Sequence, residues 1–301
     1  MIDIRQEVEA YLYYCEYQKK LSIKSIQAYS IDLKQFLSHN NNQNLSKSTI
    51  SNYITYLHKT YMPQAAKRKL ASVRAFLNYL EFEEIIDANP IRKIKTKFKE
   101  PKILPKIIPL RVIEQLLAAV HQEWANAKTA HANCAALRNV AIMEILFATG
   151  MRVSELCSLK ADDVHLEEGN IYIMGKGSKE RIIQIGNDEV LSILRQYQEA
   201  FSPSAFFFIN RFSSRISEQS VRFMLRKFRI RAGIATNVTP HMFRHSFATL
   251  LLEEDVDIRY IQRMLGHSSI QTTQIYTLVT TEKQRQILTA RHPRNKIALK
   301  Y

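Results

Sequence analysis

Hydrophobic residues recur at helical spacing through the first 90 residues of the chain. Apolar side chains three or four positions apart form four stripes, and a polar, asparagine-rich segment, HNNNQN, separates the second from the third. Ser22 and Ser25 are candidate N-caps for the second stripe, and Pro63 stands where the fourth begins. Four amphipathic helices with short connections predict a small bundle. The stripes consist of Ile4, Val8, Tyr11 and Leu12; Ile26, Tyr29, Leu33, Phe36 and Leu37; Ile50, Tyr53, Ile54 and Leu57; and Ala66, Leu70, Val73, Phe76, Leu77 and Leu80.

The helical pattern stops at Asn89-Pro90, because a residue that precedes proline is disfavoured in the helical conformation. Residues 91–109 follow without a clear period, with prolines at 101, 105 and 109 and with Lys or Arg at 92, 93, 95, 97, 99, 102 and 106. We interpret this stretch as an extended basic linker between two domains. A linker alone does not need so many cations, so we expect it to follow a phosphate backbone.

Residues 110–290 combine helical patterns with one β-like region. Residues 110–121 and 137–148 are apolar at helical spacing, whereas the Ala/Asn-rich residues 121–136 fit no period and are expected to form a long connection. The segment NIYIMGKGSKERIIQIG alternates apolar and polar residues on both sides of a glycine-rich turn, which predicts a β-hairpin. From residue 187 onward the pattern is helical again. The predicted fold class is therefore mainly α with a small antiparallel β-sheet.

The chain is strongly basic, with 43 Lys and Arg against 28 Asp and Glu and a net charge of +15. A polyanion is the partner that this charge favours. Three isolated cysteines, without CxxC spacing, argue against a disulfide framework and a zinc ribbon. No apolar run approaches the ~18 residues that span a bilayer, and the first residues lack the apolar core of a signal peptide. We therefore expect a cytoplasmic protein with no membrane partner.

Two arginines occur in settings that suit phosphate binding. Arg152 follows Gly150 at a junction between helical patterns, and Glu155, one helical step away, can hold its guanidinium. Thr239-Pro240 is typical of a helix start and places His241 and Arg244 on one face near the helix N-terminus, where anions are favoured. An arginine fork can bind two phosphate oxygens, and a neighbouring histidine can exchange a proton near neutral pH.

Tyr276 and Lys176 could complete this chemistry. Arginine and histidine around a tyrosine suit one task, which is to hold a phosphodiester while the phenolic oxygen attacks it. Lys176 lies in the Gly-Lys-Gly turn of the predicted hairpin, which can approach a backbone closely, and a desolvated lysine can act as a general acid.

His241, His245 and His267 offer an alternative, because two histidines four residues apart can bind zinc. However, no glutamate base lies between them and Arg244 would repel a metal ion. We expect His245 to be a buried structural histidine on the inner side of its helix, and we expect no metal and no cofactor.

Four motifs, ATGMRVSEL, GKGSKER, HMFRHSFAT and LGHSSIQTTQIYT, occur in this order, and together they resemble the tyrosine recombinase (phage integrase) family. The size and layout resemble its Xer-like branch, and LSIKSIQAYSIDLKQFL looks like the opening of the family's core-binding domain. The resemblance implies an N-terminal four-helix, SAM-like core-binding domain at residues 1–90, linker 91–109 and an α+β catalytic domain at 110–290. It implies that tail 291–301 could dock on a neighbouring subunit, although a frayed terminus would explain it equally well.

The resemblance also implies a role for each matching residue. Arg152 and Arg244 would clamp the scissile phosphate, supported by the carboxylate of Glu155, and His267 would hydrogen-bond to it. Tyr276 would attack the phosphorus and become a 3′-phosphotyrosine, with His241 as its acid/base partner and Lys176 protonating the leaving 5′ oxygen.

The implied function is site-specific DNA recombination through a Holliday junction. The partners would be double-stranded DNA with a specific recombination site and a homo-tetramer, or a hetero-tetramer with a second recombinase. Chromosome-dimer resolution, phage integration and transposon movement all remain compatible biological roles. The alternatives are a type IB topoisomerase, which shares the chemistry, and a catalytically inactive DNA-binding regulator. The residues expected to contact DNA are Lys67, Arg68, Lys69, Arg74, Lys93, Lys95 and Lys97.

Overall fold

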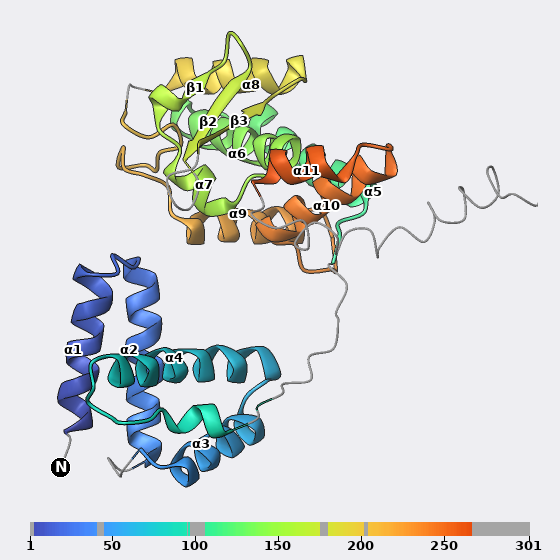
Figure 1. Ribbon diagram of the computed structural model, residues 1–301. Coiled ribbons are helices and arrows are strands. Elements are labelled where there is room, and N and C mark those ends of the chain that lie inside the picture. The colour runs from blue at the N-terminus through green and yellow to red at the C-terminus, as the bar shows by residue number, and fades with distance from the viewer. Residues whose placement is uncertain are drawn as a thin grey trace, which may run out of the picture. The chain divides into compact units, whose positions relative to one another are not determined.

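The computed structural model describes residues 3–40, 45–94, 96, 106–174, 180–201 and 204–266 (Figure 1). The chain divides into two compact units, Met1–Lys102 and Ile103–Tyr301, and the division falls inside residues 91–109. Each unit is described by itself. None of the described helices has both the length and the apolar character that a membrane crossing requires.

The first unit is a helical bundle, as the hydrophobic stripes predicted. Figure 1 shows the first two helices side by side, with the fourth lying across the second. Of the two candidate N-caps, Ser22 is confirmed, because its hydroxyl accepts a hydrogen bond from the Ser25 amide at 3.2 Å, whereas Ser25 itself lies inside the helix. Pro63 opens the fourth helix, as predicted. The elements are α1 (Ile4–Tyr17), α2 (Ile23–Asn40), α3 (Lys47–Thr60), α4 (Pro63–Phe82) and the 3₁₀ helix η1 (Pro90–Lys93).

A charged network lies inside this bundle and connects α2 to α4. The fully buried carboxylate of Asp32 accepts hydrogen bonds from Arg68 at 2.5 and 2.9 Å, from Lys69 at 3.2 Å and from the Ser72 hydroxyl at 2.7 Å. The Lys69 ammonium also donates to the Gln35 side chain at 2.6 Å. A buried carboxylate needs such partners, because an unpaired charge in the interior is strongly destabilising.

Replacing Asp32 with asparagine is expected to destabilise the first unit. The substitution keeps the side-chain size but leaves the Lys69 ammonium, whose side chain is only 9% exposed, without its counter-ion. Breaking one partner of a buried pair costs about 3–5 kcal/mol in the free energy of unfolding. Urea unfolding should show this loss for Asp32→Asn, whereas the exposed Asp87→Asn should unfold like the wild type. Equal stability of the two variants would contradict a structural role for the network.

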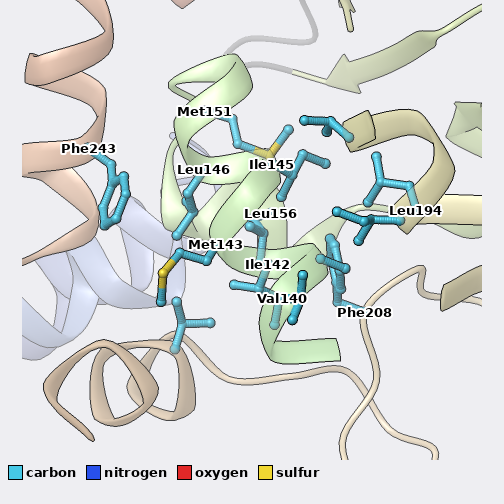
Figure 2. Packing of buried hydrophobic residues seen from close by; sticks show 14 of the residues in the cluster. Val140, Ile142, Met143, Ile145, Leu146, Met151, Leu156, Leu194, Phe208 and Phe243 are labelled. Carbon is cyan, nitrogen blue, oxygen red and sulfur yellow. The ribbon is translucent and has the colours of Figure 1, made fainter. Parts of the chain in front are cut away.

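The second unit surrounds one long apolar helix, α6 (Ala130–Thr149), with helices and a small sheet. Apolar residues are buried on all sides of α6, as expected for a helix at the centre of a core. In Figure 2 its side chains meet Leu156, Leu194, Phe208 and Phe243 from surrounding elements. Phe208 lies in the loop that follows α8, and the other three residues lie in helices. The helices of this unit besides α6 are α5 (Leu110–Ala125), α7 (Val153–Ser158), the 3₁₀ helix η2 (Ala161–Asp163), α8 (Asp188–Ala200), α9 (Glu218–Arg231), α10 (Pro240–Glu253) and α11 (Ile258–Leu265).

The predicted hairpin forms two strands of a three-stranded antiparallel sheet, in the order β1 (Val164–His165), β2 (Asn170–Met174) and β3 (Glu180–Gln184). In its register Ile171 pairs with Ile183, and Ile173 pairs with Arg181. Ile171, Ile173 and Ile183 are buried against the core, whereas Ile182 is 52% exposed. Because directly opposed residues share a face, Arg181 lies on the buried face of the sheet.

The long connection expected at residues 121–136 is wrong. Helix α5 continues to Ala125 and α6 begins at Ala130, so only residues 126–129 join them. The Thr129 hydroxyl caps α6 by accepting a hydrogen bond from the Ala132 amide at 3.1 Å. Alanine is a strong helix former that gives no hydrophobic stripe, which is why the periodicity missed these turns.

Candidate active site

Arg244 lies in the second turn of α10 and is only 4% exposed. The helix begins as predicted, with Thr239 as the N-cap and Pro240 in the first position. The Arg244 guanidinium donates to the Gly150 carbonyl at 3.0 Å and to the Leu265 carbonyl at 2.6 Å. These carbonyls lie at the C-terminal ends of α6 and α11, so one side chain joins three helices. Such contacts fix the orientation of the guanidinium before any ligand binds.

Gly150 allows this close approach. It ends α6 in the left-handed conformation with a φ of 60°, which glycine adopts without strain. A Cβ atom built on Gly150 would lie 2.6 Å from the Phe247 ring, so a larger residue fits only if that ring moves. The chain then turns directly into Arg152, which is the N-cap of α7. The predicted junction of two helices is confirmed.

Glu155 holds Arg152 at the start of α7. The Arg152 amide donates to Glu155 Oε2 and its guanidinium donates to Oε1, both at 2.8 Å. This arrangement is a capping box, in which the third helical residue bonds back to the N-cap. Glu155 therefore holds both the amide and the guanidinium of Arg152, which is consistent with the supporting role expected of it.

Arg181 is a site residue that the sequence pattern did not predict. Its guanidinium donates to both oxygens of Glu155, at 3.0 and 2.8 Å, and its Nε donates to the Met264 carbonyl at 3.2 Å. The motif GKGSKER ends with this residue, but the motif drew attention to its lysine. A usable signal was present, because Arg181 is in phase with the buried Ile183 and Ile185 on a strand where alternation predicts an aliphatic residue.

The carboxyl group of Glu155 is strongly acidic. Burial by itself would raise its pKa, but hydrogen bonds from Arg181 and from the Arg152 backbone, with the positive charge of Arg181, lower the pKa to about 2. Since the usual value is 4.5, ionised Glu155 contributes about 3 kcal/mol to stability at neutral pH. The contribution is fully present above the unfolded-state pKa and is lost as pH falls through the folded-state pKa.

We therefore expect Glu155→Gln to have a lower free energy of unfolding than the wild type at neutral pH. In acid the two proteins should become equally stable. Glutamine keeps the size of the side chain but carries no charge for the two guanidinium groups. Urea unfolding at several pH values should show the gap between wild type and Glu155→Gln closing from about pH 4.5 to pH 2. A gap that stays constant over this range would show that the charge of Glu155 does not stabilise the fold.

The two histidines of α10 differ in their surroundings. His241 is exposed in the first turn, where it is accessible to a ligand. His245 is partly buried, and burial lowers its pKa, with further lowering by His241 and Arg244. His245 is therefore neutral at neutral pH, in keeping with the structural role expected of it. Across the described ranges, no three His, Cys, Asp or Glu side chains gather as a metal site.

The residues expected to contact DNA occupy different environments in the first unit. Lys67, Arg74 and Lys93 are exposed, and the Arg74 guanidinium donates to the Thr96 hydroxyl at 3.2 Å. The Arg68 side chain is 51% exposed although it pairs with Asp32. Lys69 is instead buried in the Asp32 network, so the structure does not favour the expected phosphate contact through Lys69.

Several predicted residues lie outside the described part of the chain. Lys176 belongs to residues 175–179, between Met174 of β2 and Glu180 of β3. His267 follows Gly266 directly, and Tyr276 comes nine residues later in the sequence. Lys95, Lys97 and the tail 291–301 are also outside the described residues.

Comparison with known proteins identifies the class to which this fold and site belong. Residues 107–283 match the model of the phage integrase family, and residues 8–84 match the phage integrase N-terminal SAM-like domain. A tyrosine recombinase of Agathobacter rectalis is 48% identical over 98% of this chain and 98% of its own length. Tyrosine recombinase XerD of Listeria innocua is 35% identical over 95% of this chain and 98% of its own.

A similar fold occurs in the crystal structure of a lambda integrase tetramer bound to a Holliday junction. The TM-score is 0.71 at 16% sequence identity, over 91% of this chain and 77% of that one. The family model and the two curated relatives show that the chain belongs to the phage integrase family. It is a tyrosine recombinase, an enzyme that breaks and rejoins DNA strands. The topoisomerase and inactive-regulator alternatives find no support in these relatives.

Proposed function

We propose that the protein is a site-specific DNA recombinase that acts through a 3′-phosphotyrosine and a Holliday junction, with Arg152 and Arg244 binding the scissile phosphate. One observation carries this proposal. Arg244 donates to the carbonyl of Gly150, two residues before Arg152, although 94 positions separate the two hydrogen-bonded residues in sequence. Two arginine motifs therefore meet at one junction of helices.

The proposed reaction begins with attack of the Tyr276 hydroxyl on the phosphorus. A free tyrosine has a pKa of about 10, so its proton must leave during the attack, and His241 is the proposed acceptor. The pentacoordinate transition state gathers negative charge, which fixed cations stabilise. The two arginines and His267 supply this stabilisation, and Lys176 protonates the departing 5′ oxygen. The phosphotyrosine conserves the bond energy, so a second 5′-hydroxyl can rejoin the strand.

The proposed number of subunits follows from the number of DNA strands that must be cut. Exchange between two duplexes requires four cuts, and one nucleophile in each chain then requires four subunits on two recombination sites. The similarity in fold to a lambda integrase tetramer on a Holliday junction supports a tetramer on double-stranded DNA, either of this chain alone or with a second recombinase. Because its substrate is DNA, we place the enzyme in the cytoplasm.

DNA contact by the first unit is assigned to exposed cations. Lys67 and Arg68 lie next to each other near the start of α4, and Arg74 lies further along this helix. Lys93, Lys95 and Lys97 would continue the contact along the basic linker. Each such phosphate contact releases counterions, so binding should weaken with salt. Lys69 is left out of this set because its side chain is only 9% exposed, whereas that of Arg68 is 51% exposed although both pair with Asp32.

The function is tested by trapping the covalent intermediate. A duplex that carries a recombination site and a nick close to the cleavage position loses its 5′-hydroxyl fragment after cleavage, so rejoining stops. The expected product is an adduct that survives denaturation and disappears after proteolysis. Binding without any adduct would overturn the proposed function. Relaxation of plasmids that lack a defined site would overturn site specificity but not the cleavage chemistry.

A further inference from the structure

We propose that Arg181 is a positioning residue for DNA cleavage, which connects the hairpin carrying Lys176 to the carboxylate that orients Arg152 and to the end of α11. The inference rests on the proposed function of this site. It assigns to Arg181 a task beyond stabilising the fold, namely to keep three separate segments in register around the scissile phosphate.

The contacts of Arg181 reach two elements outside its own strand. Its guanidinium forms a two-bonded pair with Glu155 of α7, and its Nε bonds to the carbonyl of Met264 in α11. The side chain is only 12% exposed, so these bonds are largely shielded from water. Paired N–H groups on one carboxylate fix direction as well as distance.

Each segment that Arg181 joins either contacts a residue proposed to act in the reaction or is close to one in the sequence. β3 begins at Glu180, directly after the residues that contain Lys176. Met264 comes three positions before His267 in the sequence. Glu155 also accepts the guanidinium and amide of Arg152. A shift of Arg181 would therefore be transmitted to the hairpin, to the end of α11 and to the phosphate-binding arginine.

Gly266 lets the end of α11 approach the Arg181 side chain closely. Gly266 ends α11 in the left-handed conformation with a φ of 63°. A Cβ atom at this position would lie 2.9 Å from Arg181 Cδ, 3.0 Å from Nη1 and 3.1 Å from Cζ. The left-handed turn and the close approach both favour glycine here. Helix α11 therefore ends directly against the arginine.

The shared carboxylate explains why loss of Arg181 should affect Arg152. Glu155 Oε1 accepts hydrogen bonds from both guanidinium groups, and Oε2 accepts from Arg181 and from the Arg152 amide. Without Arg181, the carboxylate keeps Arg152 as its one guanidinium partner, and we expect both side chains to leave their present direction. Misplacement of reacting groups by about 1 Å can lower a rate by about 10²-fold.

The experiment measures single-turnover adduct formation on the nicked duplex for wild type, Arg181→Met and Arg181→Lys. We expect Arg181→Met to cleave about 10²-fold more slowly with DNA affinity unchanged. Arg181→Lys should lie between the two, because lysine restores the charge but not the fork. Arg195→Met is the matched control. Arg195 also bonds to a backbone carbonyl, that of Leu166 at 3.0 Å, and lies 3.6 Å from the Glu167 carboxylate. It should cleave at the wild-type rate.

A second substrate tests positioning of the hairpin. A duplex with sulfur in place of the bridging 5′ oxygen releases a thiolate, which needs no proton from Lys176. If Arg181 positions the hairpin, the defect of Arg181→Met should shrink at least several-fold on this substrate. An unchanged defect would overturn the connection to Lys176.

Other results of the cleavage and binding measurements would also contradict the proposal. Cleavage by Arg181→Met within about twofold of wild type would overturn the proposal. An equal fall in DNA affinity would overturn it as well, since a binding role would then explain the defect. If Arg181→Met melts below the assay temperature, Arg181→Lys decides, and wild-type rates in that folded variant would overturn the proposal. Absence of adduct from the wild type itself would instead refute the proposed function.

Discussion

Tyr276→Phe is expected to abolish the covalent protein–DNA adduct while leaving DNA binding intact. Phenylalanine keeps the ring but removes the oxygen that attacks phosphorus. Arg152 and Arg244, which are proposed to bind the phosphate, are unchanged. Removal of a catalytic nucleophile can lower a rate by about 10⁶-fold, so the adduct should fall below detection.

Denaturing gels with the nicked duplex measure the adduct, and a mobility-shift titration measures binding. Tyr260→Phe is the matched control, because Tyr260 is a 59% exposed tyrosine of α11 outside the proposed chemistry. It should form adduct at the wild-type rate. Adduct in Tyr276→Phe would show that another residue is the nucleophile.

Arg244→Met is expected to combine a large loss of cleavage with a loss of stability. Removing one preorganised donor that stabilises transition-state charge typically lowers a rate by about 10²–10³-fold. The substitution also removes the donors from the Gly150 and Leu265 carbonyls. Each buried polar group left without its partner costs about 1–3 kcal/mol in the free energy of unfolding. Arg244 therefore serves both the proposed chemistry and the fold, and its loss should weaken the two together.

Single-turnover cleavage and thermal unfolding should be measured together for this residue. Arg244→Lys separates charge from geometry, because its single ammonium cannot reproduce the fork that spans two carbonyls. It should recover stability better than cleavage. Arg259→Met, which removes an exposed arginine of α11 that pairs with the N-cap Asp257, is the control and should match wild type in both assays. Wild-type cleavage in Arg244→Met would exclude this arginine from the phosphate site.

Much of the fold could be predicted from hydrophobic periodicity, because helices and tight turns depend mainly on residues that are close in the sequence. The four α-helices of the first unit, the hairpin and the Thr239-Pro240 helix start were predicted from neighbouring residues. The 3₁₀ helix Pro90–Lys93 was not, because it lies where an extended linker was expected to begin. The prediction failed at residues 121–136, where α5 ends and α6 begins with alanine, asparagine and histidine. These turns are helical because of propensity and packing around Trp124, and they leave no clear apolar stripe.

The site was predictable where its contacts are local. Arg152 and Glu155 are three residues apart, so their pairing could be foreseen from helical geometry. Arg181 was missed because its partners, Glu155 and the Met264 carbonyl, are 26 and 83 positions away. Lys69 was misjudged for the same reason, since Asp32 lies 37 positions before it. Tertiary structure decides which residues pair over such separations, so the sequence shows no regular spacing from which the pairing could be predicted.

The way Arg244 is restrained has a consequence for the electric field in the site. Arg152 and Arg181 share the negative charge of Glu155, so that trio presents about one net positive charge to a ligand. The carbonyls of Gly150 and Leu265, which accept hydrogen bonds from Arg244, are uncharged dipoles. They orient the guanidinium without neutralising its charge. A carboxylate in their place would hold the side chain as firmly but would weaken its attraction for an incoming anion.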